Sequence, residues 1–113
     1  MTAILRKTST KNTELINTVL NVFWKVIDSA LKDYNLDSID LKHSSNTQFS
    51  IFDISFELVS KSIEENNSLK IIIEANCLEE NKMLTLSDDK KYKLASFTNL
   101  MRTVFSKLCE TAL

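Results

Sequence analysis

The most regular pattern of apolar residues lies in residues 14–34. Apolar side chains recur there every three or four positions, as on one side of an α-helix, and form a central stripe of Ile16, Val19, Phe23, Ile27, Ala30 and Tyr34. The stripe is flanked by Leu15, Val22 and Val26 on one side and by Leu20, Trp24 and Leu31 on the other. The apolar arc covers about half the circumference, more than the ~100° of a simple surface helix. We therefore predict a helix that packs against a sheet and against a second helix or a partner chain.

A period of two residues marks the predicted strands. Residues 38–43 alternate between apolar and polar side chains, and residues 69–78 form the strongest strand pattern. Residues 48–60 also alternate, but Phe49 and Ile51 have the opposite parity to Phe52 and Leu58, so we expect a bulge or a register break near residues 51–52. A competing helical pattern in this segment would leave apolar residues on two opposite faces. We therefore favour the strand.

The remaining elements follow from turn and cap signals. Residues 61–68 are predicted to form a connection, and residues 79–82 a hairpin loop that leads into a short strand at residues 83–86. Ser87 followed by Asp88 and Asp89 is a typical helix start, and this helix should run to about residue 112. The first helix should end near Asn35, the best available substitute for a glycine in the left-handed position.

The predicted order is helix, four strands, helix (α-β-β-β-β-α). Strands joined by short loops form an antiparallel meander, and two amphipathic helices can cover one face of it. We predict an α+β fold, with a meander of three to four strands and an N-terminal and a C-terminal helix packed on it. Residues 12–113 form this single domain, and residues 1–11 form a flexible N-terminal arm. Its core should contain Ile16, Val19, Phe23, Ile27, Ile71, Ile73, Phe97, Met101, Val104 and Leu108.

Composition excludes several classes of function. The 113 residues carry 14 basic and 15 acidic side chains, a formal net charge of −1, which gives no argument for nucleic acid or a membrane surface as a partner. The chain contains no glycine, which excludes the Walker phosphate loop, the GxGxxG turn and the GxSxG elbow. No secretory signal or bilayer-length apolar run is visible. We expect a cytoplasmic protein in which Cys77 and Cys109 are free thiols, with Cys77 buried.

Few residues are candidates for catalysis or metal binding. His43 is the only histidine, and a nucleophilic pair with Cys77 or Cys109 would need a base within hydrogen-bond reach of the thiol, which the spacing does not predict. One histidine and two distant cysteines are not a zinc pattern. We expect no catalytic residue, no metal and no cofactor. A small enzyme with a pocket near His43 is the third alternative.

Two surfaces are candidates for binding a partner. Leu20, Trp24 and Leu31 lie together at one edge of the first helix with no predicted cover from the chain itself, and exposed apolar patches mark interfaces. A basic set lies in the arm and the last helix: Arg6, Lys7, Lys90, Lys91, Lys93, Arg102 and Lys107. The helical members of this set scatter around the polar arc, whereas a helix that binds nucleic acid more often aligns them and adds exposed aromatic rings.

We therefore predict a non-enzymatic protein–protein interaction module: a small subunit, an assembly factor, an immunity-type protein or a chaperone-like adaptor. It would act through the apolar helix surface at Leu20, Trp24 and Leu31. The partner would be a second copy in a homodimer or another protein subunit, and not a membrane. A small nucleic-acid-binding module that uses the basic set is the alternative.

Overall fold

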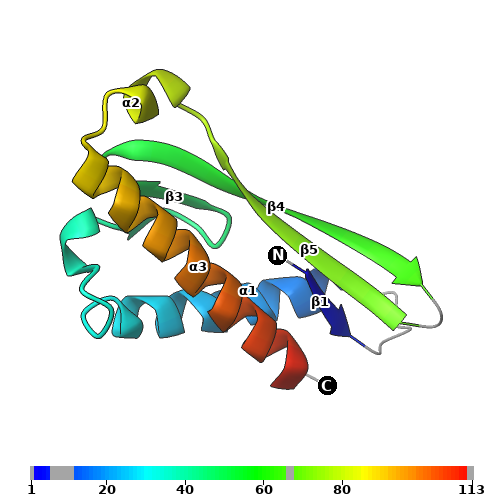
Figure 1. Cartoon of the computed structure of the whole chain (residues 1–113). Helices are drawn as coiled ribbons and strands as arrows, with labels where there is room; N and C mark the ends of the chain where they lie inside the picture. Colours follow the sequence, from blue (N-terminus) through cyan, green and yellow to red (C-terminus); the bar gives the residue numbers. More distant parts are fainter. Residues whose placement is uncertain (1, 6–11, 66–67, 112–113) are drawn as a thin grey trace.

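The computed structural model describes residues 2–5, 12–65 and 68–111. In chain order the elements are β1 (Thr2–Leu5), α1 (Asn12–Ala30), the 3-10 helix η1 (Asp37–Ile39), β2 (Lys42–His43), β3 (Gln48–Ile51), β4 (Ile54–Glu65), β5 (Ser68–Cys77), α2 (Glu80–Leu84) and α3 (Asp88–Thr111). The strands form one antiparallel sheet in the order β1-β5-β4-β3-β2. The long helices α1 and α3 cross each other against the sheet, and the short α2 lies near one end of it (Figure 1). This arrangement confirms the predicted α+β fold.

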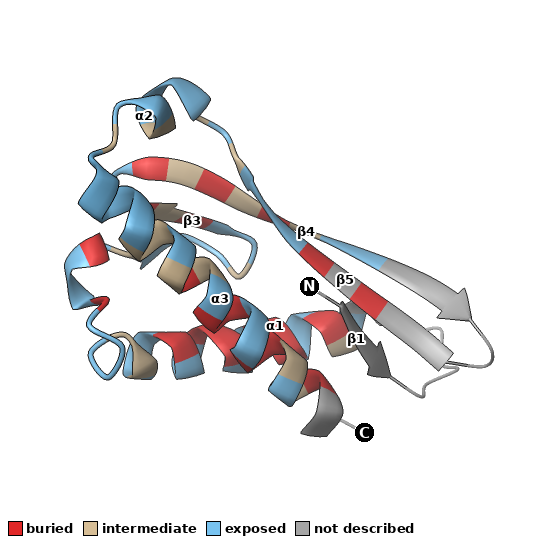
Figure 2. Ribbon diagram, in the orientation of Figure 1, coloured by how far each residue is buried: buried red, intermediate tan, exposed pale blue. Residues whose placement is uncertain are grey.

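The core lies between one face of the sheet and the two long helices. Ile54, Phe56 and Leu58 on β4 are buried and alternate with more exposed residues, and Ile71 and Ile73 on β5 are also buried. Figure 2 shows the resulting buried bands on both strands. They meet the apolar sides of α1 and α3 in one cluster. The predicted core residues are buried there, except for Leu108, which is half-buried. The described side chains of the opposite face are mainly polar, as at Ser55, Glu57 and Asn76, so the domain has two layers.

The end of α1 shows how the chain turns without glycine. Asn35 adopts φ 57°, in the left-handed region that the sequence predicted for it. The N–H of Leu36 donates to the carbonyl of Leu31 (2.8 Å), and the N–H of Asn35 donates to the carbonyl of Lys32 (3.1 Å). These are the two hydrogen bonds of a Schellman motif, which satisfies the last carbonyls of the helix. Asparagine here takes the place that glycine occupies in most proteins.

The parity break near Ile51 is a hairpin turn. Residues 48–60 form two strands, β3 and β4, in register Ile51↔Ile54. Phe52 (φ 52°) and Asp53 (φ 63°) both lie in the left-handed region, as a two-residue type I′ turn requires. The preference for strand over helix is confirmed, and the feature expected as a bulge or a register break is a tight turn. The expected connection at residues 61–68 is also largely strand, because β4 runs to Glu65 and β5 begins at Ser68.

The strand predicted at residues 38–43 is shorter than expected. Only Lys42–His43 pairs with β3, and η1 precedes it. The 3-10 turn places Leu36 and Ile39, three residues apart, in the core together, which an alternating strand could not do. The carbonyl of Ile39 also accepts the N–H of Phe52 (2.9 Å). Core burial therefore outweighs the local strand pattern.

The N-terminus differs from the expected flexible arm. Thr2–Leu5 form strand β1, antiparallel to β5 from Thr2↔Ile72 to Leu5↔Leu69. The expectation is therefore wrong for these four residues, and the rest of the arm, residue 1 and residues 6–11, lies outside the described residues. β1 covers only the first part of the outer edge of β5.

Residues 83–86 do not form the predicted strand. Residues 80–84 form the short helix α2, which leads to the start of α3. The segment Glu80–Leu84 consists mostly of residues that favour helix, and its glutamate, asparagine and lysine are uncommon in strands. This difference changes the sheet, because a strand at residues 83–86 was expected to lie next to β5.

Candidate functional site

A groove of about 390 Å³ opens between β5 and α3. We call it the β5–α3 groove. One wall is formed by residues 73–77 of β5, and the others by residues of β4, α2 and α3: Phe56, Met83, Leu94, Thr98, Met101 and Arg102. Most of the lining surface is apolar. Phe56 and Met101 belong to the core, whereas Met83, Leu94 and Thr98 are only half-buried. The groove is therefore an open continuation of the core.

Along residues 74–77, beside the groove, the main chain of β5 is paired on only one side within the described part of the chain. β4 pairs with β5 from Phe56↔Cys77 to Glu65↔Ser68, whereas the described pairs of β1 with β5 involve residues 69–72. Leu78 donates its N–H to the carbonyl of Ser55 (2.8 Å). Since successive residues of an antiparallel strand direct their N–H and C=O to alternate sides, Glu74 and Asn76 also face β4.

The N–H and C=O groups of Ala75 and Cys77 consequently point away from β4. They face the outer edge of β5, beyond the end of β1, and within the described part of the chain no strand pairs with them there. The side chains of Ala75 and Cys77 share a face with Ile71 and Ile73, so they lie on the side of the groove. Hydrogen-bonding groups and apolar side chains therefore meet at the same short edge, residues 74–77, which we call the β5 edge.

Glu79 anchors the start of α2 beside the β5 edge. Its carboxylate accepts the N–H of Ser55 (3.0 Å) and forms an ion pair with Lys82 (2.7 Å). The hydrogen bonds from Lys82 and Ser55 lower the pKa of Glu79 from 4.5 to about 2, and the same carboxylate raises the pKa of Lys82. Lys82 also donates to the carbonyl of Asp53 (3.2 Å). These contacts tie α2 to the β3–β4 turn and help to keep it off the β5 edge.

The predicted partner surface on α1 is not exposed. Leu20 (2% exposed) and Trp24 (3% exposed) are buried in the core, and Leu31 is half-buried against it. The expectation that this edge lacks cover from the chain itself is therefore wrong. Val22 (43% exposed) and Val26, on the other flank of the stripe, are exposed instead. The helical phase of α1 was predicted correctly. The buried flank of the apolar stripe is the one with Leu20 and Trp24, and the exposed flank is the one with Val22 and Val26.

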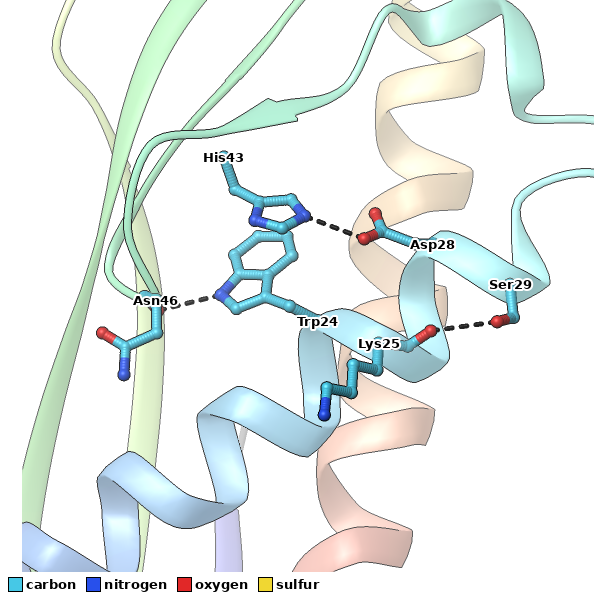
Figure 3. A network of polar contacts seen from close by, with 6 residues as sticks. All are labelled: Trp24, Lys25, Asp28, Ser29, His43 and Asn46. Carbon is cyan, nitrogen blue, oxygen red and sulfur yellow. Dashed lines mark hydrogen bonds and ion pairs between the residues drawn. The ribbon is translucent and has the colours of Figure 1, made fainter.

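The loop between β2 and β3 provides the cover for Trp24 (Figure 3). The indole Nε1–H donates to the carbonyl of Asn46 (2.9 Å), and the indole ring stacks on His43 with centroids 4.9 Å apart. Phe49 contacts the indole from β3, with ring centroids 5.2 Å apart. Because Asn46 and His43 are distant from Trp24 in sequence, helical periodicity alone could not predict this cover.

His43 joins the same cluster and does not form a catalytic pair with a thiol. Its Nε2 lies 2.9 Å from Oδ2 of Asp28, and its ring lies on Trp24. Neither cysteine is among these contacts, and none of the hollows described on the surface includes His43 in its lining. The geometry indicates that His43 and Asp28 fasten the end of β2 to α1. The prediction of a pocket near His43 gains no support.

The two cysteines differ from the expected order of burial. Both are free thiols. Cys109 is completely buried, whereas Cys77 is only half-buried and lines the β5–α3 groove. Cys77 has the predicted strand face, but α3 does not cover the end of β5. The prediction of a buried Cys77 is therefore wrong.

The basic side chains proposed for nucleic acid take part in separate contacts. Lys90 lies over the ring of Phe52 (5.2 Å to the centroid), and Lys93 pairs with Asp89 (3.4 Å). Arg102 lines the β5–α3 groove. Of the rest, Lys91 and Lys107 are exposed, and Arg6 and Lys7 lie outside the described residues.

The described residues show no metal-binding cluster and no membrane-spanning helix. Their side chains include no group of three histidine, cysteine, aspartate or glutamate residues that could hold a metal ion. No helix in this part of the chain is long and apolar enough to cross a membrane. The β5–α3 groove remains the main candidate site.

Sequence reasoning did not identify the groove, although one signal for it was present. The groove exists because residues 83–86 leave the sheet, and the helix-favouring composition of residues 80–84 was the available sign. The outward direction of the Ala75 and Cys77 main chain depends on the register with β4. That register is a tertiary property that no local pattern specifies.

Comparison with known proteins identifies no relative: no family model, no curated protein and no solved structure matches the chain. The chain is therefore assigned to no family. A fold alone does not specify a function, so the chemistry of the site is the basis for inference.

Proposed function

We propose that the chain is a non-enzymatic protein-binding domain and that its partner docks in the β5–α3 groove. The observation that carries the proposal is the coincidence of an open apolar groove with an unpaired strand edge. Apolar lining residues such as Met83 and Leu94 offer contact area, and the main chain of Ala75 and Cys77 offers donors and acceptors. Peptide-binding domains use this combination, with main-chain bonds for affinity and side-chain pockets for specificity.

The lining of the groove favours binding over catalysis. Cys77 is its one thiol and Glu74 its one carboxylate. Because the two are three residues apart on a strand, their side chains point to opposite faces of the sheet. A nucleophile needs a base within hydrogen-bond reach, and the groove lining provides no such pair. Arg102 at the rim can bind a polar group of a partner without taking part in chemistry.

A different polypeptide fits the groove better than a second copy. In a two-fold pairing of the β5 edges, Ala75 of one copy would lie opposite Cys77 of the other, so only a few residues of each copy would be paired. The pairing could not extend along β5 toward its start, because Ile72 is already paired with Thr2 of β1 and the chain leaves the strand after Cys77. We therefore favour a hetero-complex, in which this chain serves as a small subunit, an assembly factor or a chaperone-like adaptor.

The test is capture of a partner by the tagged full chain from an extract of its native cell. Ala75→Arg places a charge at an exposed position in the groove, and Val22→Arg places the same charge on exposed α1. We expect the wild type and Val22→Arg to retain a protein in near-stoichiometric amount, and Ala75→Arg to lose it. Circular dichroism and thermal melting establish that both variants are folded. Equal retention by the two variants would contradict the proposal, as would retention of no protein by the wild type.

A further inference from the structure

We propose that the partner docks as an extended segment that adds a strand to the sheet, antiparallel to β5 along residues 74–77. This inference rests on the proposed function and specifies the conformation and pattern of the bound partner. The added strand would continue the line of β1 beyond Thr2, on the same edge of β5.

The hydrogen-bonding groups of the β5 edge favour an extended main chain as the ligand. Ala75 and Cys77 each direct one N–H and one C=O outward, at the two-residue spacing of a strand. A helix has no main-chain groups to offer along its side, because its own turns use them. An extended segment can satisfy both residues, and the resulting pairs would resemble those that β1 already makes with β5.

The β5 edge also has little of the protection usual in exposed edge strands. Proteins normally protect such edges with proline, bulges, inward charges or a covering loop. Glu74 is the one charged residue of the β5 edge, and its side chain lies on the face opposite to those of Ala75 and Cys77. Ala75, Asn76 and Cys77 are uncharged, and their pairing with β4 continues without a bulge. An accessible edge of this kind, beside an apolar groove, is suited to adding a strand.

The register specifies the pattern of the partner. Directly opposed residues of antiparallel strands place their side chains on the same face. Partner residues opposite Ala75 and Cys77 would therefore exchange main-chain bonds with β5 and direct their side chains into the groove between Met83 and Thr98. The alternate residues would lie on the open face, near the exposed carboxylate of Glu74. We infer a segment with apolar residues at every second position and with basic or hydroxyl residues between them.

The orientation follows from β1 and from the sheet. All described strand pairs are antiparallel, and parallel pairing is slightly less stable per residue. In the antiparallel arrangement, the partner residues whose N–H groups face β5 are those whose side chains enter the groove. In a parallel arrangement, the partner residues whose N–H groups face β5 are instead those whose side chains lie on the open face of the sheet. Methylation of one set of amides therefore distinguishes the two orientations.

The test uses hydrogen exchange of the full chain with a capped peptide in which valine and threonine alternate between terminal lysines. In the free protein, the amides of Ala75 and Cys77 should exchange faster than those of Glu74 and Asn76. The peptide at millimolar concentration should slow the first pair by about tenfold, as expected for one added hydrogen bond each. N-methylation of the valines should abolish the protection, whereas N-methylation of the threonines should leave it.

Three results of the exchange experiment with the peptide would overturn the inference. The first is equal exchange of the four amides in the free protein, and the second is unchanged exchange of Ala75 and Cys77 with the peptide. The third is protection that survives methylation of the valines but not of the threonines, which would indicate parallel pairing. If a native partner still depends on Ala75 in the capture experiment but leaves these amides unprotected, strand addition fails and the proposed function stands. If capture does not depend on Ala75, the proposed function itself fails.

Discussion

Replacement of Phe23 by alanine tests the packing of α1 against α3 and the sheet. The ring is fully buried, with its centroid 5.1 Å from that of Trp24 and 6.1 Å from that of Phe105, both in edge-to-face geometry. Truncation of a buried phenylalanine to alanine costs about 3–5 kcal/mol, because apolar burial is lost and a cavity remains. The total stability of a domain is about 5–15 kcal/mol. Phe23→Ala should therefore remove a large part of it.

Urea unfolding measures this loss, with Trp24, the only tryptophan of the chain, as the fluorescent reporter. For a slope of about 1.5 kcal/mol per molar urea, a loss of about 4 kcal/mol lowers the midpoint by roughly 2–3 M. Val22→Ala is the matched control on the preceding residue, which is exposed. It should change the free energy of unfolding by no more than about 0.5 kcal/mol.

Similar midpoints for the two variants would contradict the burial of Phe23 in the core. A loss below about 1 kcal/mol for Phe23→Ala, far under the usual value for a buried phenylalanine, would mean that Phe23 does not face the core. The phase of α1 would then be wrong, and with it the position of α1 against α3.

The remaining predictions concern Trp24, Glu79 and the thiols. Trp24→Glu should abolish the native far-UV circular dichroism, because it buries a charge without a partner in the core; a native spectrum with unchanged melting would contradict this. Because the pKa of Glu79 is lower in the folded chain (about 2) than its ordinary 4.5, its contribution to stability should be complete above pH 4.5 and disappear as the pH falls toward 2. Acid unfolding of Glu79→Gln should lack that component, and identical acid profiles would refute it. In the folded protein a maleimide should label Cys77 much faster than Cys109, as measured by mass spectrometry of the labelled peptides. Faster labelling of Cys109 would contradict this prediction.

The long elements were predictable because their patterns extend over many residues. α1 and α3 repeat their apolar positions over several turns, and β5 alternates along its length, so the period identifies each element. The same period identified Phe23 as a core residue. It could not determine which flank of α1 would be covered, because the cover of Trp24 comes from the loop at Asn46, far away in sequence. Sequence periodicity identifies the apolar arc of a helix, whereas tertiary contacts decide which part of that arc is buried.

The short elements were less predictable because competing forces are similar in size there. Residues 38–43 alternate, but joint burial of Leu36 and Ile39 favours a 3-10 turn. Residues 83–86 were predicted as a strand, and helix propensity favours α2. The candidate site depends on that second difference, since the absence of a strand leaves Ala75 and Cys77 at an open edge. The fold was therefore predictable in outline, and the site was not.

A map of amide chemical shifts on adding the purified partner to the isotopically labelled chain tests directly whether the partner docks in the β5–α3 groove. We expect the largest changes to cluster at Ala75, Cys77, Leu94 and Thr98, while the indole N–H signal of Trp24 stays in place. Changes that cluster instead around Val22 and Val26 on α1, with the groove signals unmoved, would contradict it.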